Sequence, residues 1–183
     1  MRRMRRMRRP RTLFAVLAGL VVAVAVSLLV SGGSSAAPTK SQALFKKTLL
    51  ADERTTSDVK QLLSEGGGFV APDDTFADLT GDGRSDAIVL VDSGGVAGAV
   101  ALYVFSTDGE PEDSDLRGVY RSQRLYRAST EIADGTLILR TPRFVEGDAV
   151  CCPAKIVQRT YAWSAGSKTL RQRRSEELPG PTG

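Results

Sequence analysis

The chain has 183 residues, of which 25 are lysine or arginine, 21 are aspartate or glutamate and none is histidine. Without histidine it lacks the commonest general base and the commonest transition-metal ligand, so Ser-His-Asp and Cys-His mechanisms are excluded. Its two cysteines cannot by themselves close a tetrahedral zinc site of nitrogen and sulfur ligands.

The N-terminus has the features of an export segment. Seven arginines lie in Met1–Arg11, an uncharged run follows over residues 13–30, and the small residues of Ser31–Ala37 come next. This order is typical of a signal peptide cleaved after Ala36, but the apolar run is long for a signal peptide and near the lower length limit of a retained membrane anchor. We therefore expect residues 1–36 to be a signal peptide or an N-terminal membrane anchor. The domain would then be secreted or lie at the extracytoplasmic face of the membrane.

Loss of this segment would reverse the charge of the protein. The full chain carries +4, but without the seven N-terminal arginines 18 basic residues face 21 acidic ones, a net charge of about −3. The basic character thus belongs to the export segment, and we expect no nucleic-acid partner. Contact with the membrane is expected only through the N-terminal segment, if it is not cleaved. The remainder is long enough for one domain with its own core.

Two short helices are predicted after a linker at residues 37–40. The first, Ser41–Leu50, carries apolar residues at helical spacing, and the second, Ser57–Ser64, begins at a good N-cap and ends before three glycines. Short amphipathic helices bury their apolar stripe, so we expect both to cover one face of a sheet.

After Gly68 the pattern changes to the alternation typical of strands, with turns at Gly94-Gly95 and Asp134-Gly135. The predicted strands are Ala87–Val91, Val96–Phe105, Val119–Tyr126, Gly135–Arg140, Lys155–Trp163 and, as a sixth, Thr169–Arg173. The predicted fold class is therefore α+β, with N-terminal helices packed on an antiparallel β-meander of five or six strands. We expect a single domain over residues 41–175 and a disordered tail at 176–183.

The acidic stretch Asp78–Asp86 carries the most specific chemical signal. Its pattern, Asp-x-Thr-Gly-Asp-Gly-x-x-Asp before a hydrophobic strand, resembles the calcium loops of FG-GAP and VCBS-type repeats and the first half of an EF-hand or dockerin loop. The resemblance implies one calcium ion, held by side chains at positions 1, 3, 5 and 9 and by the backbone carbonyl at position 7. The implied ligands are Asp78, Thr80, Asp82, the carbonyl of Arg84, and Asp86.

Two positions depart from the EF-hand pattern. Thr80 is a weaker ligand than an aspartate, and Val89 stands where an EF-hand has its bidentate glutamate. The loop therefore matches the short nine-residue type, and a single copy cannot build a propeller. Asp73 and Asp74 are candidates for one further ligand. The alternative is a turn rich in glycine and aspartate that needs no ion.

The two cysteines are neighbours, at Cys151 and Cys152. An oxidising compartment favours a disulfide, but adjacent Cα atoms about 3.8 Å apart are closer than the roughly 4.4–6.8 Å of an unstrained bridge. A vicinal disulfide, two buried thiols and an intermolecular bond therefore remain open. A thioredoxin-like role is not expected, because the Cys-x-x-Cys spacing is missing.

Arginines gather around the predicted strand Val119–Tyr126. Those that strand alternation places on one face are Arg117, Arg121 and Arg127. They fit either an anionic ligand, such as an acidic envelope polymer, or an ordinary solvated sheet face. The aromatic side chains expected in the core are Tyr120, Tyr126, Tyr161 and Trp163.

No catalytic motif stands out. We therefore expect an exported or envelope-anchored, non-catalytic binding or structural module that is stabilised by one calcium ion and has an unidentified ligand, such as a cell-envelope polymer. The alternative is a cell-wall or polysaccharide hydrolase that uses an Asp/Glu pair. Glycoside hydrolysis needs two carboxylates about 5–10 Å apart, and the candidates are Glu146 and Asp148, which lie near the cysteines.

Overall fold

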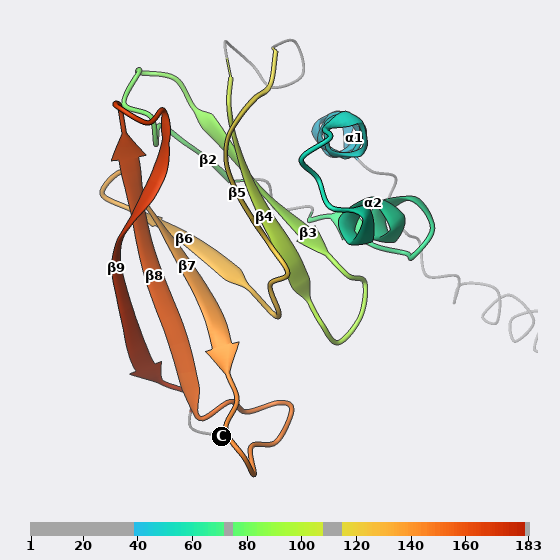
Figure 1. The fold of residues 1–183 in the computed structure, drawn as a ribbon, viewed down its shortest axis with the longest axis vertical. Coiled ribbons are helices and arrows are strands. Elements are labelled where there is room, and N and C mark those ends of the chain that lie inside the picture. The colour runs from blue at the N-terminus through green and yellow to red at the C-terminus, as the bar shows by residue number, and fades with distance from the viewer. Residues whose placement is uncertain (1–38, 72–74, 108–114, 182–183) are drawn as a thin grey trace, which may run out of the picture. The chain divides into compact units, whose positions relative to one another are not determined.

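Two helices precede nine strands in the part of the chain that the computed structural model describes, residues 39–71, 75–107 and 115–181 (Figure 1). The helices are α1 (Lys40–Ala51) and α2 (Ser57–Ser64), and the strands are β1 (Phe69–Val70), β2 (Thr75–Ala77), β3 (Asp86–Asp92), β4 (Ala99–Ser106), β5 (Arg117–Gln123), β6 (Ser129–Ala133), β7 (Thr136–Arg143), β8 (Lys155–Ser164) and β9 (Thr169–Pro179). No helix among these residues is long and apolar enough to cross a membrane. The expected export segment at residues 1–36 lies outside the described residues, as do Asp73 and Asp74.

The helix α1 begins at a reciprocal cap. The backbone N–H of Gln42 donates to Thr39 Oγ1 at 3.2 Å, and the backbone N–H of Thr39 donates to Gln42 Oε1 at 2.8 Å. The Gln42 amide also donates to the Val70 carbonyl at 3.3 Å. The cap that starts the helix therefore also ties it to β1.

The strands form two antiparallel sheets. In the first, β1 and β2 both pair with β3, and β4 and β5 follow; in the second, β6, β7, β8 and β9 pair in chain order. The prediction of an α+β fold with antiparallel strands is confirmed. The single meander of five or six strands is wrong, because the chain leaves the first sheet after β5 and starts a second one at β6. The sequence reading missed β1 and β2, which are very short, and β6, whose residues are mostly polar.

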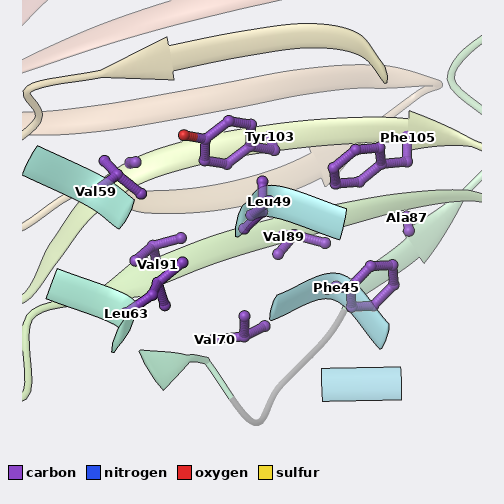
Figure 2. Packing of buried hydrophobic residues seen from close by; sticks show 11 residues of the cluster. Phe45, Leu49, Val59, Leu63, Val70, Ala87, Val89, Val91, Tyr103 and Phe105 are labelled. Atoms are coloured by element: carbon purple, nitrogen blue, oxygen red, sulfur yellow. The ribbon is translucent and has the colours of Figure 1, made fainter. Parts of the chain in front are cut away.

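Two apolar cores lie on the two faces of the first sheet. One contains Phe45 and Leu49 of α1 and Val59 and Leu63 of α2, together with residues of the sheet (Figure 2). The sheet residues labelled in Figure 2 are Val70, Ala87, Val89, Val91, Tyr103 and Phe105. The second core joins the two sheets, with members such as Leu102 of β4 and Leu139 of β7. The strand β4 thus sends alternate side chains into both cores, which explains why its sequence is a continuous apolar run.

The strand β9 continues past residue 175, where we expected the domain to end. Leu178 pairs with Ile156 and Pro179 with Lys155. The Glu177 carboxylate forms ion pairs with Lys155, at 2.8 Å, and with Arg143. The segment expected to be a disordered tail from residue 176 is therefore strand as far as Pro179, because β8 is long enough to pair with it.

Candidate functional site

The acidic loop connects β2 to β3 in the first sheet. Ala77 and Asp86 pair across its base. Leu79 is buried in the core between the sheets, and the Ser85 carbonyl accepts a hydrogen bond from Thr107 Oγ1 at 2.7 Å. Contacts on both sides of the loop therefore anchor it to the rest of the sheet. Nothing in the sequence pointed to Thr107, which lies beyond the end of β4.

The carboxylate of Asp78 organises the first half of the loop. Its Oδ1 accepts the backbone N–H groups of Gly81 at 2.6 Å and Asp82 at 3.2 Å, and its Oδ2 accepts that of Gly83 at 2.9 Å. Gly81 and Gly83 have φ of 74° and 81°, a region that a side chain disfavours. These glycines allow the chain to wrap around the Asp78 carboxylate.

The carboxylate of Asp86 organises the second half from the interior. Its side chain is fully buried, and its Oδ2 accepts the backbone N–H groups of Leu79 and Thr80, both at 2.8 Å. Thr80 Oγ1 donates to the other oxygen at 3.4 Å. Burial raises the pKa of Asp86 above its ordinary value, and the hydrogen bonds from Thr80 and Leu79 offset part of that shift.

The five predicted ligands are thus brought together in part. Thr80 lies against Asp86, and Asp82 lies beside Asp78, while Asp82 Oδ1 accepts the backbone N–H of Arg84 at 2.9 Å. Asp78 and Asp82 are exposed, whereas Asp86 is buried. Among the described residues, no three acidic, cysteine or histidine side chains are grouped so that they could hold a metal ion. Calcium therefore remains a prediction for this loop.

The second candidate region is the β7–β8 loop, which contains both cysteines. Cys151 and Cys152 are joined to each other as a disulfide of neighbouring residues, and both are exposed. The Cys152 N–H donates to the Ala149 carbonyl at 2.9 Å, so the bridge sits on a tight turn. The bridge closes no long stretch of chain, and its effect is confined to this loop.

The proposed catalytic carboxylates lie in the same loop. Asp148 Oδ2 accepts the backbone N–H groups of Val145 at 2.9 Å and Ala154 at 2.8 Å, and therefore closes the loop. The hydrogen bond from Ala154, followed by that from Val145, lowers the pKa of Asp148. A glycosidase acid needs the opposite shift, since it must stay protonated near neutral pH. The side chain of Glu146 is exposed.

The arginines around β5 do not follow simple alternation, because a bulge interrupts the pairing of β4 with β5 at Val104/Phe105. Val119 is buried in the core between the sheets, and its neighbour Tyr120 packs against the same core. Tyr161 and Trp163 also belong to this core, as expected, but Tyr126 is exposed. The expectation that Tyr126 lies in the core is therefore wrong, because β5 ends at Gln123 and Tyr126 follows it in a connection.

Comparison with known proteins adds no assignment: no family model matches the chain, and neither a curated protein nor a solved structure matches it.

Proposed function

We propose that residues 38–183 form an exported or envelope-anchored, non-catalytic binding or structural module, stabilised by one calcium ion in the β2–β3 loop. In this module the two helices close one face of the first sheet. The chain following Asp86 runs directly through the interior of the module as β3. An ion in the loop would therefore stabilise the strand on which the first core depends.

The oxygen ligands and the close carboxylates of the acidic loop support the proposal that it binds calcium. Its five candidate ligands are all oxygen donors, which calcium prefers. The Asp78 carboxylate already gathers three backbone N–H groups around itself, and a carboxylate oxygen that accepts one hydrogen bond keeps a further lone pair. The observation that carries the proposal is that three carboxylates share nine residues, with Asp82 close enough to raise the pKa of the buried Asp86 further. A divalent cation would replace this repulsion with attraction.

Calcium should raise the thermal stability of the protein after treatment with a chelator. An ion that binds only the folded state adds RT ln(1 + [L]/Kd), or about 2.7 kcal/mol at 100 times Kd, which corresponds to several degrees in Tm. Magnesium should add less, because it demands tighter octahedral geometry. Scanning calorimetry with calcium, magnesium and chelator measures the difference. An unchanged Tm would show that the loop is a turn that binds no calcium.

A pair of variants separates the site from general charge effects. Asp82→Ala should abolish the calcium response, because it removes a ligand at the loop surface. Asp92→Ala should keep it, because Asp92 lies at the other end of β3 and accepts the N–H of Gly94 at 2.7 Å. Loss of the response in both variants would contradict a site at Asp78–Asp86.

The binding role itself is tested with isolated cell-wall polymer. We expect the protein to be retained on the polymer without the release of reducing sugars, because the Asp148 carboxylate accepts the backbone N–H groups that close its own loop. Release of reducing sugars that Asp148→Asn abolishes would favour the hydrolase. Such a result would overturn the non-catalytic assignment and leave the calcium prediction standing.

A further inference from the structure

Most exposed large apolar side chains of the described chain gather in three connections. The seven such residues are Phe69, Phe76, Val96, Tyr126, Phe144, Val145 and Val150. Phe69 and Phe76 lie on β1 and β2. The other five lie in the β3–β4 turn, in the β5–β6 connection and in the β7–β8 loop. In Figure 1 these three connections lie towards the lower end of the two sheets.

Arg127 joins the three connections into one surface. Its backbone N–H donates to the Ala97 carbonyl in the β3–β4 turn at 2.8 Å, and its Nη1 donates to the Val150 carbonyl in the β7–β8 loop at 2.5 Å. The ring of its neighbour Tyr126 meets that of Phe144 edge-on, with centroids 5.9 Å apart. We call this surface the apolar end and define it by Val96, Tyr126, Phe144, Val145 and Val150.

The apolar end protrudes. Val96 is 84% exposed at the tip of its turn, and Val150 is 65% exposed directly before the disulfide. The β7–β8 loop that carries Val150 is held in place by the Asp148 carboxylate and by Arg127. Exposed apolar side chains that cluster on a fixed surface mark an interaction site, because a water-facing surface gains nothing from them.

The residue types suit the interface of a lipid bilayer. Aliphatic tips can enter the acyl boundary, and aromatic rings such as Tyr126 and Phe144 favour the headgroup level. Arg124 and Arg127, both exposed, flank Tyr126 and can pair with lipid phosphates. Glu146 opposes them in the same region, so the contact would be mainly apolar and would depend little on anionic lipid.

The length of the preceding chain places a bilayer within reach. The uncharged run ends at Val30 and α1 begins at Lys40. The nine residues between them span at most about 30 Å when fully extended. If the N-terminal run stays in the membrane, the lipid surface is the partner that the domain meets at the highest effective concentration.

We propose that the apolar end inserts into the interfacial region of a lipid bilayer and forms a second membrane contact besides the N-terminal segment. This proposal rests on the membrane location proposed above and does not depend on calcium. The contact would fix the orientation of the domain on the membrane surface. Other faces of the module would then remain open to a partner in the envelope.

A tryptophan probe in the full chain tests the contact. Trp163 is first replaced by phenylalanine, and the probe is then introduced as Val96→Trp or, as a matched control, as Phe76→Trp. Phe76 is 41% exposed and pairs with Ala87, at the opposite end of β3 from the β3–β4 turn. Each protein is bound to phosphatidylcholine vesicles with brominated acyl chains, and its tryptophan fluorescence is recorded.

We expect a blue shift and several-fold stronger quenching for Val96→Trp than for Phe76→Trp, with or without added phosphatidylglycerol. A second probe, Val150→Trp, should behave like Val96→Trp. Vesicle binding without quenching at either position would overturn the inference and leave the N-terminal anchor intact. A blue shift without quenching would show that a second copy of the chain covers the surface, which also overturns it. No vesicle binding at all would overturn both the inference and the membrane location.

Discussion

The β2–β3 loop and the β7–β8 loop are each held by one aspartate carboxylate, which is buried in the first loop and lies at the surface in the second. In each, Oδ2 of one aspartate accepts two backbone N–H groups at 2.8–2.9 Å, from Leu79 and Thr80 to Asp86 and from Val145 and Ala154 to Asp148. Burial raises the pKa of Asp86, whereas the hydrogen bonds lower the pKa of Asp148 at the surface. The same pair of backbone hydrogen bonds thus accompanies opposite pKa shifts, because desolvation outweighs the hydrogen bonds at Asp86, even with the third from Thr80 Oγ1, and is too small to do so at Asp148.

This difference in burial implies that the β2–β3 loop is coupled to the core and that the β7–β8 loop is not. Asp86 is the first residue of β3 and lies inside the protein, so the N–H of the buried Leu79 would have no water to replace the carboxylate. The partners of Asp148 belong to exposed residues. We expect the β2–β3 loop to open only with global unfolding and the β7–β8 loop to open locally.

The largest effect is expected from Asp86→Ala. The N–H of Leu79 would lose its acceptor inside the protein, that of Thr80 would lose it at the edge, and a cavity would remain. Unsatisfied buried donors cost about 1–3 kcal/mol each, so roughly 2–4 kcal/mol of unfolding free energy should be lost. Urea denaturation under chelator measures it. Asp82→Ala in the same loop should cost below about 1 kcal/mol, as is usual at exposed positions; equal losses in both variants would contradict the comparison.

A smaller loss of stability is expected from Asp148→Ala. Water can replace the carboxylate at the N–H groups of Val145 and Ala154, since both residues are exposed. The Tm should fall less than in Asp86→Ala, while amide exchange at Val145 and Ala154 should become much faster. Hydrogen exchange with mass spectrometry would detect this change. If the exchange of the β2–β3 loop rose as well, the two loops would not be independent.

The pH dependence should have opposite signs at the two aspartates. The raised pKa of Asp86 means that the folded state binds the extra proton, so the stability contributed by this group falls as pH rises above about 4 towards its folded pKa. The lowered pKa of Asp148 means that its contribution is present above about 4 and is lost as pH falls through its folded pKa.

Asparagine variants isolate these two contributions. With chelator present, Asp86→Asn should gain stability relative to the wild type as pH rises above about 4. Asp148→Asn should lose stability relative to the wild type as pH rises towards that value. Denaturation midpoints across the pH range would show both slopes. Parallel slopes for the two variants would mean that burial does not distinguish the sites.

The smallest effect on global stability is expected from reduction of the Cys151–Cys152 disulfide. A bridge between adjacent residues constrains the unfolded chain little, so reduction should cost about 1 kcal/mol or less. Its effect should appear as faster amide exchange within residues 145–154. The double variant Cys151→Ser with Cys152→Ser should match the reduced protein. A large loss of Tm in either sample would show that this loop supports the core.

The local pattern of the sequence was enough to predict both helices and the strands that carry long apolar runs. The bounds predicted for α2 match those observed, since the glycines that end the helix act within a few residues. The predicted N-cap at Ser57 is wrong, because Thr56 is the N-cap and makes no side-chain cap hydrogen bond. The position of the acidic loop before β3 also followed from the sequence, since turn residues and strand residues meet there. These features depend on neighbours along the chain.

The division into two sheets required the tertiary structure. The residues of β6 are mostly polar, so no strand was predicted before the turn at Asp134-Gly135, although β6 pairs with β7 across that turn. The bulge in β5, where Val119 has no partner in β4, likewise turns two successive residues, Val119 and Tyr120, towards the same core. A bulge of one residue moves every following side chain of the strand to the other face of the sheet, and the local sequence pattern does not predict where a bulge occurs.

The chemistry of the candidate residues was also decided by tertiary placement. Asp78, Asp82 and Asp86 occupy regular positions in one motif, yet only Asp86 among them is buried, because it begins the strand on which both cores depend. Tyr126 and Val150 are far apart in the sequence, and the hydrogen bond from Arg127 to the Val150 carbonyl brings their segments together. Burial, and contact between residues that are far apart in the sequence, depend on how the chain folds in three dimensions. The sequence alone therefore determined which residue types are available and in what order they stand, and the folded structure determined their surroundings.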